Sequence, residues 1–335
     1  MTRIQDVICH AWAESTHESY GSGLLVYHVY CDSRLIPEPE RAPASSTLIS
    51  AFIAFAAGSY SGKTIANYVF GVRAWHILHG LEWSLDDMQI DALLKATENL
   101  TPSTSKRKKR HPYTVQFICS LRDHLDLDSP LDASVFSCLT TSFYCTARVG
   151  EFTVPTLSSF DPNIHVKPSN MRIEHDRNNL QMRVFHIPRT KTSRDGEDVS
   201  FAPQYGPSDP EQALLHHLRI NEPPPGGAVF AYRFKNGYRP LTKPKFIARL
   251  AQAARAAGMD PLQGHGIRIG STLEYLLRNV PFEVVKTKGR WSSDAFQLYL
   301  RKHAQIMAPY MQAAPALHED FLRFAMPRPI NSPIA

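Results

Sequence analysis

Cysteines and long apolar runs are scarce in this sequence. Only five cysteines occur among its 335 residues, and no two of them form a Cys-x-x-Cys pair. This number and spacing argue against a disulfide framework and against a zinc knuckle. The longest apolar segment, residues 48–57, is shorter than a bilayer-spanning helix requires. The first residues also lack the apolar core of a secretory signal, so we expect an intracellular protein.

The excess of one charge sign is also small. The 37 basic and 31 acidic residues leave a net charge of +6, so the placement of the cations matters more than their total. One run consists of Lys106, Arg107, Lys108, Lys109 and Arg110. A second zone, between Glu222 and Asp260, contains no acidic residue; its cations are Arg233, Lys235, Arg239, Lys243, Lys245, Arg249 and Arg255. Clustered cations suit a phosphate backbone, although a solvated face with a nuclear-import signal explains them equally well.

Length and composition predict two domains. The chain is about twice as long as a typical domain, and its 43% hydrophobic and 20% charged residues argue against disorder along the whole chain. The stretch 101–112 is polar and basic, with two prolines and no apolar residue, which is typical of an exposed linker. We therefore expect a first domain over residues 1–105, a basic linker over 106–112, a second domain over 113–326 and a disordered tail over 327–335.

Helical periodicity dominates both domains. In the first, the apolar patterns predict a bundle of four or five helices that includes 47–57, 63–79 and 85–98, the last with Ser84 and Asp87 as a capping box. In the second, strand-like segments at 171–175 and 180–187 flank a hairpin turn, and 199–202 would add a short third strand. Helices are predicted at 114–124, 133–148, 209–220, 243–257, 266–279, 282–288 and 293–302. The expected fold is therefore mainly α, with an N-terminal helical bundle and a C-terminal α+β domain that contains a small antiparallel sheet.

One segment that resembles a nucleotide-binding motif does not fit the pattern of a P-loop. Residues 58–64, GSYSGKT, resemble a phosphate-binding P-loop but are one residue short between the glycines. They also follow a helical pattern, whereas a P-loop needs a strand before it. We expect a turn between two helices, no nucleotide binding, and a Lys63 side chain that is free to contact DNA.

Several polar residues stand where apolar segments end. Arg148 and Glu151 are three residues apart, which places them on one helix face, as a structural ion pair or as an anion site. His265 and Arg268 repeat this spacing near a predicted helix start, where backbone amides also favour an anion. Lys191 follows a predicted strand, and Trp291 and Tyr299 flank the start of a predicted helix. Each residue alone also has an ordinary structural explanation, such as an ion pair, a core aromatic or a solvated lysine.

The ordered combination is more specific than any of its parts. An arginine, a lysine after a hairpin, His-x-x-Arg, Gly-x-Trp and then a tyrosine resemble the tyrosine recombinase, or phage integrase, superfamily. The sequence segments ARVGEF, HGIRIGS and GRWSSDAFQLYL are most similar to those of the eukaryotic branch associated with Crypton-type mobile elements of fungi. The resemblance covers about residues 17–310 and is strongest from residue 112 onward.

The resemblance implies a two-domain clamp around double-stranded DNA, made of a SAM-like core-binding domain and a catalytic domain with the DNA breaking-rejoining enzyme fold. Tyr299 would attack a phosphodiester to form a 3′-phosphotyrosine. The expected supporting residues are Arg148 and Arg268 on the phosphate oxygens, His265 as proton acceptor, Lys191 as general acid, Trp291 beside the phosphate and Glu151 as an orienting carboxylate. The family needs neither a metal nor another cofactor. It works as a homo-oligomer, a tetramer on DNA, and this branch implies a nuclear protein without a membrane or nucleotide partner.

The nucleophile has two rivals in the sequence. Tyr299 follows Trp291 by eight residues, one fewer than in many bacterial members of the family, so the intervening turn must compensate a rotation of about 100° per residue. Tyr275 shares a predicted helix with Arg268 and cannot easily reorient. Tyr310 lies beyond the predicted end of the helix that carries Tyr299.

Further DNA contacts are predicted from exposed cations, with a solvated surface as the alternative for each. The candidates are Lys63, Thr64, Tyr68 and Arg73 on one helix, Lys106, Arg107, Lys108, Lys109 and Arg110 in the linker, and Lys243, Lys245 and Arg249 on a later helix. Two other functions stay open at this point. One is a domesticated recombinase that binds DNA without cutting it, and the other is a type IB topoisomerase that relaxes DNA without a partner strand.

Overall fold

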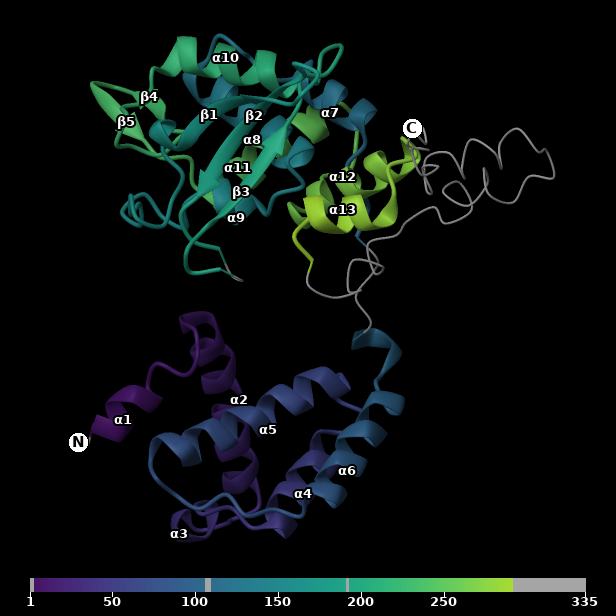
Figure 1. Ribbon diagram of the computed structural model, residues 1–335. Coiled ribbons are helices and arrows are strands. Elements are labelled where there is room, and N and C mark those ends of the chain that lie inside the picture. The colour runs from purple at the N-terminus through teal and green to yellow at the C-terminus, as the bar shows by residue number, and fades with distance from the viewer. Residues whose placement is uncertain (1–2, 106–109, 191–192, 292–335) are drawn as a thin grey trace, which may run out of the picture. The chain divides into compact units, whose positions relative to one another are not determined.

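The computed structural model describes residues 3–105, 110–190 and 193–291, and the chain divides into two compact units, Met1–Lys109 and Arg110–Ala335 (Figure 1). The predicted helix at 293–302 and the predicted tail at 327–335 lie outside the described residues.

The first unit is helical throughout its described part. Its elements are α1 (Arg3–Ile8), α2 (Glu14–Ser33), α3 (Glu38–Arg41), α4 (Ser46–Ala56), α5 (Gly62–Leu78), α6 (Asp87–Asn99) and the 3₁₀ turn η1 (Ser103–Ser105). Side chains cap three of the helices, because Ser45, Ser61 and Asp86 each accept a hydrogen bond from a backbone N–H of the first turn. The predicted helix at 85–98 therefore begins two residues late, with Asp86 rather than Ser84 as its cap.

Helices α2 and α5 form the tightest contact of this unit. A β-carbon at Gly23 would lie 2.6 Å from the backbone of Tyr68, and one at Gly71 would lie 2.5 Å from the carbonyl oxygen of Tyr20. The two backbones can approach this closely because both positions lack a side chain. In the buried core of this unit, Tyr27 of α2 and Phe52 of α4 pack edge to face.

The second unit combines helices with two small sheets. Its helices are α7 (Val115–Arg122), α8 (Pro130–Tyr144), α9 (Val149–Phe152), α10 (Pro210–Asn221), α11 (Lys243–Ala256), α12 (His265–Leu277) and α13 (Phe282–Lys288), with a 3₁₀ turn η2 (Pro168–Asn170). Its strands are β1 (Met171–His175), β2 (Gln181–Ile187), β3 (Glu197–Phe201), β4 (Tyr232–Phe234) and β5 (Gly237–Arg239). The first three form an antiparallel sheet in the order β1-β2-β3, and β4 pairs with β5.

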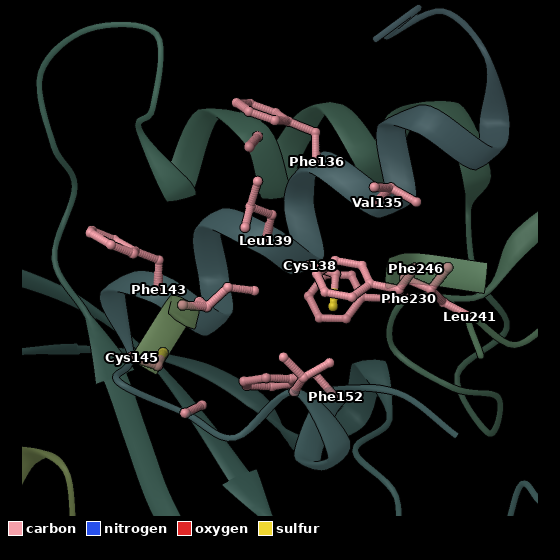
Figure 2. Close-up of a cluster of buried hydrophobic side chains, with 14 of the residues drawn as sticks. Val135, Phe136, Cys138, Leu139, Phe143, Cys145, Phe152, Phe230, Leu241 and Phe246 are labelled. Carbon is pink, nitrogen blue, oxygen red and sulfur yellow. The ribbon is translucent and has the colours of Figure 1, made fainter. Parts of the chain in front are cut away.

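Helix α8 is the centre of the second unit. Every residue from Asp132 to Tyr144 is buried, so the helix contacts protein on all sides, as expected for a helix without a polar face. Figure 2 shows Phe136, Leu139 and Phe143 of this helix in the cluster that also contains Phe152 and Phe230. Several of its hydroxyl groups are hydrogen-bonded inside this core; Ser134, for example, donates to the carbonyl oxygen of Phe230 over 2.8 Å. The hydroxyls of Ser137 and Thr141 are buried there without a hydrogen-bond partner among the described residues. This rigid helix fixes the position of the segment that follows it.

The architecture confirms the predicted fold class, mainly helical with small antiparallel sheets, and the second unit differs from the prediction at the end of α8 and in a second hairpin. The predicted helix at 133–148 stops at Tyr144, because Thr146 adopts a left-handed backbone with a φ of 53°. The hairpin β4–β5 was not predicted, since its strands have only three residues each. No helix in the described ranges is long and apolar enough to cross a bilayer.

The packing of α12 against residues 111–113 gives a stability prediction. The amide of Tyr113 donates to the carbonyl oxygen of Gly266 over 3.0 Å, and a β-carbon at Gly270 would lie 2.0 Å from the carbonyl oxygen of Tyr113. Gly270→Ala should therefore lower the free energy of unfolding by about 2 kcal/mol, although alanine is the better helix former. Urea unfolding followed by circular dichroism measures this.

Gly226→Ala is the matched control, because a β-carbon there has no neighbour within 4 Å. It should change the stability by less than about 0.5 kcal/mol. A Gly270→Ala variant as stable as the control would contradict this account of how α12 packs.

Candidate active site

The end of α8 positions the first predicted site residue, Arg148. After the left-handed turn at Thr146, whose hydroxyl is hydrogen-bonded to that of Ser271 over 2.8 Å, Arg148 becomes the residue that precedes α9. Its backbone N–H donates to Oε2 of Glu151 over 2.8 Å, and its Nη1 donates to Oε1 of the same carboxylate over 3.0 Å. The two residues therefore form the ion pair that their spacing predicts.

Arg148 keeps donors for a ligand. Its side chain is 33% exposed, whereas that of Glu151 is 7% exposed. Within the described residues, the bond to Glu151 is the one hydrogen bond of its guanidinium group, and this group has five N–H donors. The remaining donors can bind an anion such as a phosphate.

Arg268 lies at the junction of three segments. It belongs to the first turns of α12 and is only 3% exposed. Its Nη1 donates to the carbonyl oxygen of Thr146 over 3.2 Å, and its Nη2 donates to that of Gly289. Its guanidinium carbon lies 4.3 Å from the ring centroid of Trp291, a cation–π contact. One buried cation thus connects the end of α8, the start of α12 and the turn after α13.

Trp291 depends on the glycine two residues before it. A β-carbon at Gly289 would lie 1.6 Å from the Trp291 ring, so no other residue fits there without displacing the indole. The ring also packs against the small apolar cluster of Leu273, Leu276 and Val285. The tryptophan is therefore held on two sides, by the guanidinium of Arg268 and by helices α12 and α13.

His265 is the first residue of α12 and is half-buried. Burial lowers the pKa of its imidazole, and the positive charges of Arg110, Arg268 and Arg148 lower it further. The imidazole is therefore neutral at neutral pH and can accept a proton. The contacts agree with this, because Arg268 donates to the carbonyl oxygen of Thr146, two residues before Arg148, although Arg148 and Arg268 are far apart in the sequence.

Glu151 binds a second arginine that the sequence analysis missed. Burial raises the pKa of this carboxyl group, but the charges and hydrogen bonds of Arg290 and Arg148 outweigh burial and hold the pKa below its usual value. Nη2 of Arg290 lies 2.6 Å from Oε2 of Glu151, and its Nη1 lies 3.0 Å from Oε2 of Glu197. The sequence offered one signal for this residue, a cation at the middle position of the Gly-x-Trp motif on which the family resemblance rests.

Two of the predicted catalytic residues, Lys191 and Tyr299, lie outside the described residues, as does the rival nucleophile Tyr310. The segment with Lys191 connects β2, which ends at Ile187, to β3, which begins at Glu197. The other rival, Tyr275, is described. Its hydroxyl donates to the carbonyl oxygen of Tyr144 over 2.8 Å, and burial raises its pKa, so it is a poor nucleophile.

The predicted DNA contacts differ in how exposed they are. In the first unit, Lys63 and Arg73 are exposed, while Thr64 and Tyr68 are half-buried on the same helix, α5. In the second unit, Arg110, Lys243 and Lys245 are exposed. Lys106, Arg107, Lys108 and Lys109 lie outside the described residues.

Arg249 is held inside the protein instead. Its Nε and Nη2 lie 2.7 Å and 2.6 Å from the two carboxylate oxygens of Asp132, and its side chain is 19% exposed. Such a bidentate pair uses the donors that a phosphate would need.

Neither a P-loop nor a metal cluster is present in the described ranges. Residues 58–61 belong to the predicted turn between α4 and α5, with Gly58 in a left-handed conformation. No group of three or more His, Cys, Asp or Glu side chains in these ranges is arranged to hold a metal ion.

The electrostatics of His265 give a titration prediction. Its resonances in a histidine-selective NMR titration should report a pKa below the ordinary value of about 6.5, and Arg110→Gln should raise that pKa, because one of the neighbouring positive charges is removed. Since the folded protein binds this proton less readily than the unfolded chain, acidification below about pH 6.5 should destabilise the second unit. A pKa at or above 6.5 in the wild type would contradict the assignment of a neutral imidazole.

Comparisons with known proteins identify the fold. No protein-family model matches the chain, and no curated protein matches its sequence. Among solved structures, a lambda integrase(75-356) dimer bound to a COC′ core site matches with a TM-score of 0.57 and 14% identity, over 90% of this chain and 94% of that one. The XerH site-specific recombinase bound to palindromic difH matches with a TM-score of 0.57 and 13% identity, over 88% of this chain and 79% of that one. Both are tyrosine recombinases, and this chain has their fold.

Proposed function

We propose that this protein cleaves and rejoins double-stranded DNA through a covalent 3′-phosphotyrosine formed by Tyr299. The observation that carries the proposal is that α12, with His265 and Arg268, packs against the segment that leads to Arg148. Arg268 donates to the carbonyl oxygen of Thr146, two residues before Arg148, and the charges of both arginines lower the pKa of His265. The recombinase fold supports it, because the likeness to the DNA-bound structures extends over most of the chain.

The cations of this site suit a phosphodiester. Its transition state concentrates negative charge on the non-bridging oxygens, and guanidinium groups can contact two of these oxygens at once. Arg148 has free donors and is 33% exposed, whereas Arg268, whose two outer nitrogens donate to carbonyl groups, contributes a fixed positive charge to the site. Donors that are fixed before the reaction cost no reorganisation when charge develops, and each can contribute about 3 kcal/mol to catalysis.

The proposed cleavage step is a transesterification without net hydrolysis. The hydroxyl oxygen of Tyr299 attacks the phosphorus, the bond between phosphorus and the 5′ oxygen breaks, and the phosphate at the new 3′ end of the strand stays attached to the tyrosine. The phenolic proton passes to neutral His265, and Lys191 donates a proton to the departing 5′ oxygen. Rejoining is the reverse, with a 5′ hydroxyl as the nucleophile and the tyrosine as the leaving group.

The biological setting is also part of the proposal. The residues of these sequence motifs favour an enzyme of a Crypton-type mobile element that integrates at specific sites. The basic run 106–110 suits a nuclear protein as well as a contact to the DNA backbone. Exchange of strands between two duplexes requires four active sites, so we propose a homotetramer on DNA.

A covalent adduct tests the proposed function directly. On a nicked duplex that loses a short fragment after cleavage, wild-type protein should form a detergent-resistant protein–DNA adduct, also in the presence of EDTA. Tyr299→Phe should abolish the adduct, because the nucleophilic oxygen is missing. Tyr310→Phe is the matched control and should leave it intact. Suitable duplexes come from the DNA that flanks the coding sequence.

The outcomes of this experiment separate the three candidate functions. Binding without any wild-type adduct would indicate a protein that recognises DNA but no longer cuts it. An adduct together with relaxation of plasmids, but no exchange of strands, would indicate a topoisomerase. An adduct formed by Tyr299→Phe would show that the nucleophile is another residue.

The N-terminal turn of α11 gives a prediction about DNA affinity. Lys243 and Lys245 are exposed there, so replacing either with alanine should reduce the slope of log K against log salt concentration by about 1, without loss of stability. Fluorescence anisotropy at several salt concentrations measures the slope.

Arg249→Ala should behave differently. It leaves the buried carboxylate of Asp132 without its partner and should destabilise the protein by about 3 kcal/mol, while the salt slope of the folded protein stays the same. A changed slope and unchanged stability for Arg249→Ala would reverse the roles assigned to these cations.

A further inference from the structure

We propose that Arg290 is a positioning residue that holds both the phosphate-binding Arg148 and the hairpin that carries Lys191. The inference rests on the proposed function and extends it to a residue outside the predicted catalytic set.

The guanidinium group of Arg290 bridges two carboxylates. Its Nη2 lies 2.6 Å from Oε2 of Glu151, and its Nη1 lies 3.0 Å from Oε2 of Glu197. The side chains of Arg290 and Glu151 are 10% and 7% exposed, so this contact is shielded from water. Its Nε, also buried, has no hydrogen-bond partner among the described residues. Because both outer nitrogens are bound to carboxylates, Arg290 supports other residues and does not itself bind DNA.

Each carboxylate supports one predicted catalytic residue. Glu151 accepts hydrogen bonds from the backbone and from the side chain of Arg148. Glu197 is the first residue of β3 and pairs with Ile187, the last residue of β2. This is the last residue pair of the two strands, and the segment 188–196, which contains Lys191, connects them. Arg290 therefore connects the support of the phosphate-binding arginine to the base of the lysine hairpin.

The backbone conformation indicates that the arginine side chain is needed here. Arg290 has a φ of 56°, a left-handed conformation that glycine adopts at least cost. The residue before it, Gly289, accepts a hydrogen bond from Arg268, and the residue after it, Trp291, packs on Arg268. An arginine at this strained position places its guanidinium between the two carboxylates while its neighbours bind the other site arginine.

Arg290 also balances the charge beside the site. Arg148 and Arg290 contribute two positive charges, and Glu151 and Glu197 contribute two negative ones, so the four-residue network is neutral. Without Arg290 the network would carry one negative charge next to a site that must bind a phosphate. Glu151 would then attract the guanidinium of Arg148 more strongly, and Arg148 would have fewer donors for DNA.

The experiment compares Arg290→Met, Arg290→Lys and Glu197→Gln on two nicked duplexes. One duplex has the normal 5′ oxygen at the cleavage point, and the other has a sulfur atom in its place. A thiolate leaves without a proton, so the sulfur duplex does not need the general acid Lys191. Arg172→Met is the matched control. Arg172 is on β1 and pairs with Asp198, the residue after Glu197 on β3, where both side chains are exposed.

Glu197→Gln should cleave the normal duplex slowly and the sulfur duplex at the wild-type rate, because it loosens only the hairpin. Arg290→Met should be slower by about 100-fold on the normal duplex and only partly recovered on the sulfur duplex, because Arg148 is displaced as well. Arg290→Lys retains the charge but cannot bridge two carboxylates, so it should stay slow. Arg172→Met should cleave both duplexes at the wild-type rate.

A second measurement does not depend on cleavage. The amide resonances of Arg148 and of residues 188–196 should shift in Arg290→Met and stay unchanged in Arg172→Met. Unshifted resonances, or wild-type cleavage by folded Arg290→Met, would overturn the inference. If Arg290→Met fails to fold, Glu197→Gln decides, since wild-type cleavage of the normal duplex by this isosteric variant also overturns it. If the wild-type protein forms no adduct but the resonances do shift in Arg290→Met, the result would instead overturn the proposed function alone.

Discussion

The burial of one cation, Arg268, determines how the site is built. A guanidinium that is 3% exposed must be compensated inside the protein, and here the carbonyl oxygens of Thr146 and Gly289 do this, together with the indole of Trp291. These contacts require the chain to turn sharply at Thr146 and require glycine at 289. The turn that provides a carbonyl for Arg268 is also the turn that places Arg148 before α9.

A neutral network lies next to this cationic centre. Glu151 and Glu197 neutralise Arg148 and Arg290, so the excess positive charge that acts on His265 resides at Arg268 and Arg110. Burial and these charges therefore keep the imidazole neutral, while Arg148 keeps donors for an anion. A site of this kind can bind a phosphodiester and accept a proton from a nucleophile without first rearranging its own charges.

The sequence predicted the elements better than the contacts between them. Periodicity was sufficient for α4, α5 and the β1–β2 hairpin, because each has a regular apolar pattern and clear end signals. The break of 133–148 at Tyr144 was missed, because a left-handed threonine stabilised by the distant Ser271 leaves no local signal. Arg290 was missed for the same reason, since Glu151 and Glu197 are brought to it only by the fold. The spacing of His265 and Arg268 was informative because both lie within one helical turn.

The attachment site of the DNA tests the central claim most directly. Trypsin cuts after Arg290 and Arg301, and the peptide between them contains one tyrosine, Tyr299. Mass spectrometry of the digested protein–DNA adduct should therefore find the nucleotide phosphate on Tyr299 within this peptide. A nucleotide attached to a peptide with Tyr275 or Tyr310, or to a serine, would contradict the account.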